Sequence, residues 1–169
     1  MTQVNLDLSY PKENIKILLL EGIHPSAVRN LNKNGFANVE RHDIAWSEEE
    51  LLDKIADVHV IGIRSKTQIT EKVIRNAPKL KAVGCFCIGT NQVDLATATR
   101  AGITVFNSPY SNTRSVAELV IAESIMLLRK IPLRDKKAHE GIWLKDARES
   151  YEIRGKRIGI IGYGHIGSQ

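Results

Sequence analysis

The amino-acid sequence predicts an α/β fold in which a doubly wound parallel sheet is followed by the beginning of a second α/β unit. Short apolar runs alternate with helical patterns up to about residue 107, and the loops between them are short. The apolar runs show no strict alternation with polar residues, which is typical of parallel strands covered on both faces. A further apolar run near residue 160 leads directly into a glycine-rich loop, which indicates the second unit.

The first half of the sheet is predicted from the residues before Arg64. Strands are expected at residues 15–20, 38–41 and 58–63. A helix opens near Pro25, places its apolar residues on one face and stops at Gly35. A second helix follows Ser47, because Ser47 and Glu50 have the spacing of a capping box, in which each side chain accepts the backbone amide of the other.

The second half of the sheet repeats this pattern. A helix over residues 70–76 begins after a Thr70 cap and ends before Pro78. The remaining elements are expected as a strand at residues 80–84, a helix at residues 95–100 and a strand at residues 103–106. Together the elements up to residue 107 predict a complete doubly wound sheet of the flavodoxin-like kind, with an ordinary domain size.

A long apolar helix is predicted after this domain, from about residue 115 to 130. Residues Ser115 and Glu118 have the spacing of a second capping box at its start. Apolar side chains cover most of its circumference, so we expect the helix to be buried between domains or subunits. Pro132 breaks the pattern, and the charged stretch through Glu152 is expected to form an exposed helix and loop.

The glycine-rich loop at residues 162–167 follows an apolar run at residues 156–161 that has the character of a parallel strand. The first glycine permits a tight turn, the second lets a pyrophosphate approach the backbone, and the third lets helix and strand pack closely. The loop thus predicts dinucleotide binding by Gly162, Tyr163, Gly164, His165, Ile166 and Gly167. The loop alone does not distinguish NAD from NADP or FAD.

Composition and charge exclude several classes of protein. The chain has 169 residues, 43% of them hydrophobic and 25% charged, which is typical of a soluble globular protein. Its net charge of +5 comes from scattered basic residues with few aromatics between them, so no nucleic-acid partner is predicted. No apolar run reaches the ~20 residues of a membrane span. Cys85 and Cys87 are too few for a zinc site, and we expect both to be buried reduced thiols.

Two loops at the predicted carboxyl ends of strands have residues suited to binding an anion. Arg64 offers a planar fork, Ser65 a hydroxyl group and Lys66 a point charge, directly after the strand at residues 58–63. Gly89 follows the strand at residues 80–84 and could let a backbone amide approach a ligand. The alternatives are that the two cations are solvated loop residues and that Gly89 merely serves a turn.

Four segments carry a resemblance to a known family. They are residues 62–67, 84–94, 106–119 and 159–167. Together they resemble the D-isomer-specific 2-hydroxyacid dehydrogenase family, and the runs GTNQVD at residues 89–94 and SNTRSVAEL at residues 111–119 resemble its phosphoglycerate-oxidising members. The resemblance extends from about Lys16 to the last residue and includes no metal site.

This resemblance implies a cytoplasmic oxidoreductase that converts 3-phospho-D-glycerate to 3-phosphohydroxypyruvate with NAD, the first step of L-serine biosynthesis. It implies a substrate-binding domain at residues 1–107 and the start of a Rossmann NAD-binding domain at residues 108–169. Arg64, Ser65 and Lys66 would hold the phosphate and carboxylate of the substrate, and Gly89 would add a backbone amide. Relatives usually have arginine in place of Lys66, so bidentate binding there is in question while the charge is kept.

The resemblance also assigns residues in the second domain. Asn112 would help to close the cleft near the nicotinamide, Trp143 would pack against a partner subunit, and Lys145 would reach into the active site of that subunit. A homo-oligomer follows, dimeric through the nucleotide domain and tetrameric at full length. The catalytic arginine, glutamate and histidine of the family are expected beyond Gln169, so this chain is expected to contain no catalytic residue and to be inactive alone.

Two other functions stay open from the sequence. The chain could belong to a non-catalytic dinucleotide-binding protein of the same fold, or it could be an α/β binding domain that never handles a dinucleotide. The anion-binding loop at Arg64 favours the enzyme over the first alternative, and the loop at Gly162 disfavours the second.

Overall fold

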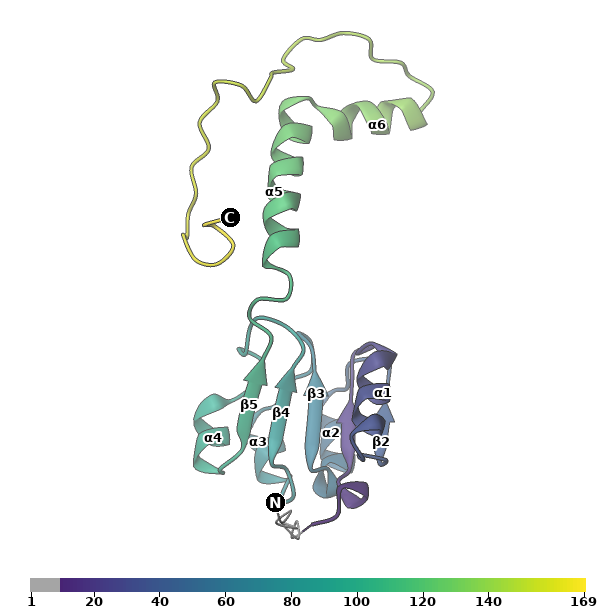
Figure 1. The fold of residues 1–169 in the computed structure, drawn as a ribbon. Helices are drawn as coiled ribbons and strands as arrows, with labels where there is room; N and C mark the ends of the chain where they lie inside the picture. Colours follow the sequence, from purple (N-terminus) through teal and green to yellow (C-terminus); the bar gives the residue numbers. More distant parts are fainter. Residues whose placement is uncertain (1–9) are drawn as a thin grey trace, which may run out of the picture. The chain divides into compact units, whose positions relative to one another are not determined.

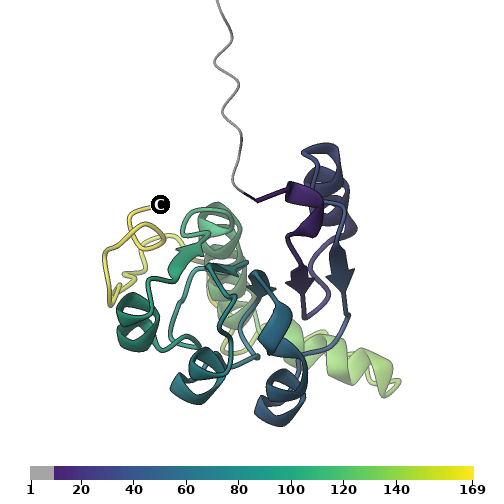
Figure 2. The ribbon, with the colours of Figure 1, turned by 90° about the horizontal axis from the view of Figure 1, so that it is seen from below.

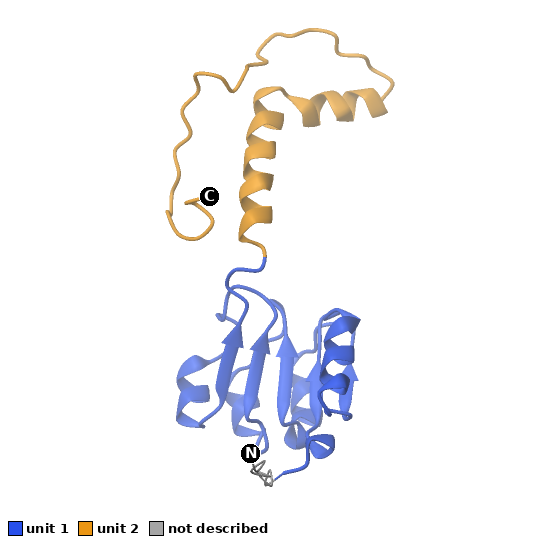
Figure 3. Ribbon diagram, in the orientation of Figure 1, with its two compact units in different colours: residues 1–111 blue, residues 112–169 orange. Residues whose placement is uncertain are grey.

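The computed structural model describes residues 10–169. The chain divides into two compact units, Met1–Ser111 and Asn112–Gln169, which Figure 3 distinguishes by colour. The sequence predicted a division at residue 107. The assignment of the first unit to the substrate and of the second to the nucleotide stays a prediction.

The first unit is built on a five-stranded parallel sheet with the order β2-β1-β3-β4-β5 (Figure 1). The strands are β1 (Ile17–Leu19), β2 (Val39–Arg41), β3 (Val60–Ile63), β4 (Ala82–Cys85) and β5 (Thr104–Asn107). This strand order is that of a flavodoxin-like doubly wound sheet, so the predicted fold class is confirmed. Because every strand runs in the same direction, all five carboxyl ends meet at one edge of the sheet.

Helices cover the two faces of this sheet unequally. The helices are α1 (Pro25–Lys33), α2 (Glu48–Lys54), α3 (Glu71–Arg75) and α4 (Leu95–Arg100), with short 3-10 turns at Lys12–Asn14 and Ile55–Asp57. Leu18 of β1 belongs to a buried cluster with residues of α2, α3 and α4, whereas its neighbours Ile17 and Leu19 pack with residues of α1. Thus α1 lies on the opposite face of the sheet from the other three helices (Figure 2).

The predicted helix caps of the first unit are confirmed. Ser47 Oγ accepts the Glu50 amide at 3.2 Å, and Glu50 Oε2 accepts the Ser47 amide at 2.7 Å, which completes the capping box of α2. Thr70 Oγ1 accepts the Val73 amide at 3.3 Å at the start of α3. The caps explain why these short helices begin where they do, since each satisfies an amide that the helix leaves free.

The second unit contains α5 (Thr113–Leu128) and α6 (Ile131–His139), and the rest of it is irregular. The predicted second capping box is wrong. The helix already begins after Asn112, and Glu118 pairs with Arg114 one turn earlier, at 2.8 Å, so its carboxylate is engaged on the helix surface. The large apolar side chains of α5 are exposed, including Leu127 at 70%, so the predicted burial is absent from the described chain and the interface role stays a prediction.

The strand predicted at residues 156–161 is also absent. A strand needs a neighbour to pair its backbone groups, and the described residues of the second unit form no other strand. In the following loop, the tight turn expected at the first glycine is present, but no helix follows the loop within the described residues. Gly162 has φ +88°, and a Cβ at Gly167 would collide with the Gly162 carbonyl group.

Candidate anion-binding site

The carboxyl ends of β3 and β4 bring two of the predicted site segments side by side. The strands pair in register from Val60 with Ala82 to Ile63 with Cys85. Arg64, Ser65 and Lys66 follow β3, and Gly89 lies in the loop after β4; all four are exposed. The first unit therefore brings together the residues that the sequence nominated for the anion, at the edge of the sheet where ligands of such folds bind.

The loop after β3 is folded around a buried carboxylate. Glu21, which lies two residues after β1, is only 8% exposed. Its Oε1 accepts the amides of Arg64 at 3.0 Å and Thr67 at 2.9 Å, and its Oε2 accepts the amide of Lys66 at 3.0 Å. Burial by itself raises the pKa of the Glu21 carboxyl, but the hydrogen bonds from Thr67, Arg64 and Lys66 outweigh it and hold the pKa below its ordinary value.

The two loops are joined by Gln92, whose side chain is buried under them. Its Nε2 donates to the Arg64 carbonyl group at 2.6 Å and to the Gly89 carbonyl group at 3.3 Å. The same amide lies 3.1 Å from Cys87 Sγ. Gln92 is 3% exposed, and its position is therefore fixed by the protein interior. One side chain thus sets the distance between the anion-binding loop and the loop of Gly89.

A backbone bridge and a side-chain hydrogen bond connect further segments at the same edge of the sheet. Ile69 and Val93 form an isolated parallel bridge between the segments that follow the two loops. Asn107 Nδ2, at the end of β5, donates to the Ile88 carbonyl group at 2.7 Å. These contacts make the site part of the rigid sheet, which favours a defined ligand geometry.

The cysteines near this site are both free, as the sequence predicted. Cys85 is buried, and burial raises the pKa of its thiol to about 11. The predicted burial of Cys87 is wrong, because this residue lies beyond the end of β4, where the loop leaves it partly exposed. Its Sγ donates to the carbonyl groups of Arg64 at 3.4 Å and Gly89 at 3.3 Å. Cys87 thus belongs to the junction between the two loops.

The charges of the site are available to a ligand. Neither Arg64 nor Lys66 takes part in an ion pair with any residue that the structure describes. The amides of Ser65 and Gly89 likewise donate to no acceptor within residues 10–169. Two cations and two free amides at one edge of a sheet can bind a phosphate or a carboxylate. Within the same range, no group of three or more metal-ligating side chains exists.

The other predicted site residues belong to the second unit. Asn112 precedes α5, and its side chain makes no capping hydrogen bond. Lys145 lies in the irregular segment after α6, two residues after Trp143, which is 81% exposed. The glycine loop lies near the end of the same unit, with Tyr163 exposed. The grouping of these residues with Arg64 in one site stays a prediction.

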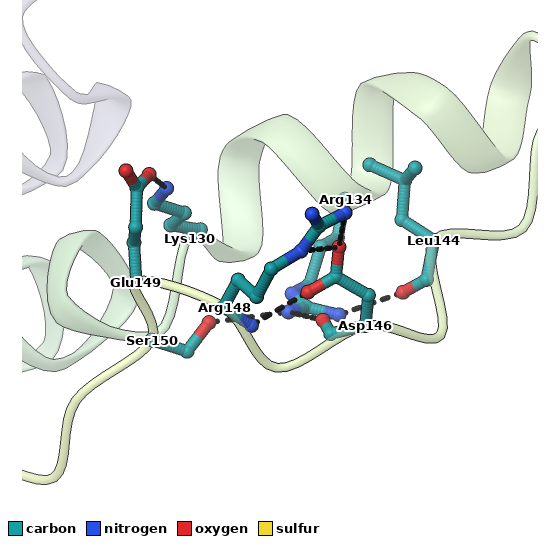
Figure 4. A network of polar contacts seen from close by, with 7 residues as sticks. All are labelled: Lys130, Arg134, Leu144, Asp146, Arg148, Glu149 and Ser150. Atoms are coloured by element: carbon teal, nitrogen blue, oxygen red, sulfur yellow. Dashed lines mark hydrogen bonds and ion pairs between the residues drawn. The ribbon is translucent and has the colours of Figure 1, made fainter.

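Sequence reasoning missed the residue that organises the segment around Lys145. Arg134 of α6 donates through Nη1 to the Leu144 carbonyl group at 2.7 Å and through Nη2 to the carbonyl group of Asp146 and to Ser150 Oγ, the latter at 3.1 Å (Figure 4). It therefore ties down both neighbours of Lys145. The guanidinium and amide of Arg148 hold the pKa of Asp146 at about 2.

Comparison with known sequences identifies the family. The sequence profile of the D-isomer specific 2-hydroxyacid dehydrogenase catalytic domain matches residues 17–161. The chain belongs to this dehydrogenase family. The family predicted from the motifs of the sequence is thus confirmed, and the sheet and the loops at Arg64 and Gly89 lie within the matched residues.

Individual relatives agree with the assignment of this chain to the family. The chain is 56% identical over 162 residues to D-3-phosphoglycerate dehydrogenase of Escherichia coli (strain K12), which covers 96% of this chain and 40% of that protein. It is 56% identical over 156 residues to D-3-phosphoglycerate dehydrogenase 1 of Saccharomyces cerevisiae, with 92% of this chain and 33% of that protein covered. The chain therefore spans well under half the length of these relatives.

A solved structure supports the fold as well. The NAD-dependent formate dehydrogenase of Staphylococcus aureus, solved in complex with NAD, matches with a TM-score of 0.77 and 28% identity. The match covers 91% of this chain and 51% of that one. A dehydrogenase of this fold thus binds NAD in the solved structure. None of the described helices of the present chain is long and apolar enough to cross a bilayer.

Proposed function

We propose that the protein to which this chain belongs oxidises 3-phospho-D-glycerate to 3-phosphohydroxypyruvate with NAD, as the first step of L-serine biosynthesis. The observation that carries the proposal is the pair of exposed, unneutralised cations, Arg64 and Lys66, on a loop fixed by Glu21 and Gln92. The names of the Escherichia coli and yeast relatives, each 56% identical, support this choice of substrate.

In this proposal the anion-binding loops hold both charged ends of the substrate. The guanidinium of Arg64 offers paired donors to the phosphate or carboxylate, and Lys66 adds a point charge. The hydroxyl group of Ser65 and the free amide of Gly89 complete the set of donors. Asn112 and Lys145 would contribute from the second unit, Lys145 to the site of a partner subunit.

The cofactor of the proposed reaction is NAD, bound at the glycine loop. The positive φ of Gly162, which gives the tight turn that a dinucleotide loop needs, supports this assignment. When bound, NAD supplies the nicotinamide that accepts a hydride from the carbon bearing the substrate hydroxyl group. The residues at 162–167 would bind the dinucleotide, while the first unit orients the acid. We assign no acid–base residue to this chain.

The apolar surface of α5 supports a homo-oligomer for the proposed enzyme. Exposed apolar residues run along the helix, among them Leu119, Ile121 and Ile125. Several exposed large apolar side chains on one helix are typical of an interface. We propose a dimer through the second unit and a tetramer at full length, with the cytoplasm as the location of a biosynthetic enzyme.

Substrate specificity tests the proposed function. NADH absorbance is followed in both reaction directions with the purified protein, using 3-phosphoglycerate, D-glycerate and D-lactate at matched concentrations. Each lost hydrogen bond to a charged group is worth ~1.5–3 kcal/mol, so kcat/KM should fall about 100-fold when the phosphate is missing. Equal values for 3-phosphoglycerate and D-glycerate would contradict the proposal. A protein that binds NAD and oxidises none of the three acids would instead be a non-catalytic dinucleotide binder.

A further inference from the structure

The buried carboxylate of Glu21 accepts three amides of the loop at Arg64, although Glu21 is not among the residues proposed to bind the substrate. We propose that Glu21 is a positioning residue for the substrate anion, holding the loop at Arg64–Thr67 in the conformation that presents Arg64 and Lys66 to the ligand. The inference rests on the proposed function, because it concerns the same anion-binding loop. It adds a residue that contacts neither the substrate nor the cofactor and that acts through the loop.

The pattern of amides defines how the loop is held. The amides of Arg64, Lys66 and Thr67 all point inward to the two oxygens of Glu21, within 2.9–3.0 Å. The Ser65 amide donates to none of the described residues, and the side chains at 64–66 are exposed. Three converging amides form a concave anion-binding surface, and here an internal carboxylate fills it. The substrate is therefore left with the side chains of the loop and the Ser65 amide.

The backbone at Glu21 is held in place by the loop after β2 and by β3. Its own amide donates to the Ile44 carbonyl group at 3.0 Å, and the preceding amide, of Leu20, donates to the Gly62 carbonyl group at 2.9 Å. Its φ is +60°, a left-handed backbone conformation that residues other than glycine rarely adopt. A strained residue persists where its surroundings determine it and is a marker of functional sites. In this backbone conformation, the carboxylate of Glu21 accepts the amides of the loop at Arg64–Thr67.

A charge at this position is matched to its surroundings. Both oxygens of Glu21 are acceptors, and all three amides are donors. In a glutamine, an NH₂ group replaces one of the two side-chain oxygens. This NH₂ group would face at least one backbone amide, and two hydrogen-bond donors would then lie opposite each other. The loop would then open at Lys66 or at Arg64 and Thr67. Because paired donors must match the geometry of a phosphate, a small shift of the loop lowers affinity.

The decisive comparison is between Glu21→Gln and Glu50→Gln in the complete protein. Glu50 is a matched control, because its carboxylate also accepts a backbone amide, that of Ser47, at a helix start remote in sequence from the loop. For Glu21→Gln we expect KM for 3-phosphoglycerate to rise about tenfold, with kcat and KM for NAD within about twofold of the wild type. Glu50→Gln should leave both KM values unchanged. A purely structural role would not separate the two substrates.

Two results for Glu21→Gln would overturn the inference: an unchanged KM for 3-phosphoglycerate, or an equal rise in the KM values for 3-phosphoglycerate and NAD. If Glu21→Gln does not fold, Glu21→Asp is measured by the same criteria, since it keeps the charge but is one methylene too short to reach all three amides. A wild-type protein that does not oxidise 3-phosphoglycerate would refute the proposed function instead. In that case the affinity for inorganic phosphate is measured directly, where a tenfold loss in Glu21→Gln supports the role of Glu21 and an unchanged affinity refutes it.

Discussion

Replacing Gly62 by alanine should destabilise the first unit by about 1–3 kcal/mol, the usual cost of overpacking a core. A Cβ at Gly62 would lie 2.6 Å from Leu19 Cδ2, 3.0 Å from Phe86 Cε2 and 3.1 Å from Ile23 Cδ1. Phe86 is 47% exposed and can move toward solvent, but Leu19 and Ile23 are 2% and 3% exposed and cannot. The strain therefore falls on β1 and on the turn that carries Glu21.

The neighbouring glycine provides the control for this prediction. Gly84 pairs with Gly62 across β3 and β4, but its added Cβ would come no closer than 3.4 Å to Phe86 Cε2, an ordinary contact. Gly84→Ala should therefore be neutral, or stabilising by about 0.5–1 kcal/mol, because alanine loses less backbone entropy than glycine in a strand. Native-state hydrogen exchange of the amides of β1 and β3 measures both free energies of opening. Equal effects of the two substitutions would refute the packing described at β3.

Three further predictions concern the same unit. Ser47→Ala removes the cap of α2 and should lower the free energy of unfolding by about 1 kcal/mol, as measured by urea titration; no change would mean that the box contributes nothing. At pH 8, iodoacetamide should alkylate Cys87 before Cys85, because the thiol of Cys85 is buried and has a pKa of about 11. Mass spectrometry of the peptides measures the order of alkylation, and faster alkylation of Cys85 would contradict the prediction. The pKa of Glu21 is lowered in the folded protein. The ionised carboxylate of Glu21 therefore stabilises the fold fully above the ordinary carboxyl pKa, and this contribution is lost as the pH falls through the lowered pKa. The stability difference between wild type and Glu21→Gln should therefore narrow in acid, and a difference that stays constant down to pH 3 would contradict this.

Much of the first unit could be predicted from local sequence signals. Apolar runs located all five strands to within about two residues, and the helix at Leu95–Arg100 has the bounds that its pattern indicated. The caps at Ser47 and Thr70 follow from side chains three residues from their partners. Arg64, Ser65 and Lys66 were identifiable because cations directly after an apolar strand lie at the edge where ligands bind.

The contacts that organise the site were beyond local reasoning. Glu21 lies 43 to 46 residues from the amides that it accepts, and Gln92 lies 28 residues from Arg64, so both roles depend on the order of strands. The pair Glu21-Gly22 indicates a turn, but it does not indicate that the glutamate also has a positive φ. The glycine loop could be located from its sequence. The strand predicted before it is absent, because a strand needs a neighbouring strand, and this unit contains none within the described residues.

The proposed role of the first unit is tested most directly by Arg64→Ala in the complete protein. Loss of the guanidinium removes charge-assisted hydrogen bonds of ~1.5–3 kcal/mol, so KM for 3-phosphoglycerate should rise about 10- to 100-fold. KM for NAD should stay within about twofold. Arg75→Ala, which removes an exposed arginine paired with Glu71 on α3, is the control and should leave both values unchanged. Equal rises in the two KM values for Arg64→Ala, or no rise in either, would contradict the assignment of Arg64 to the substrate.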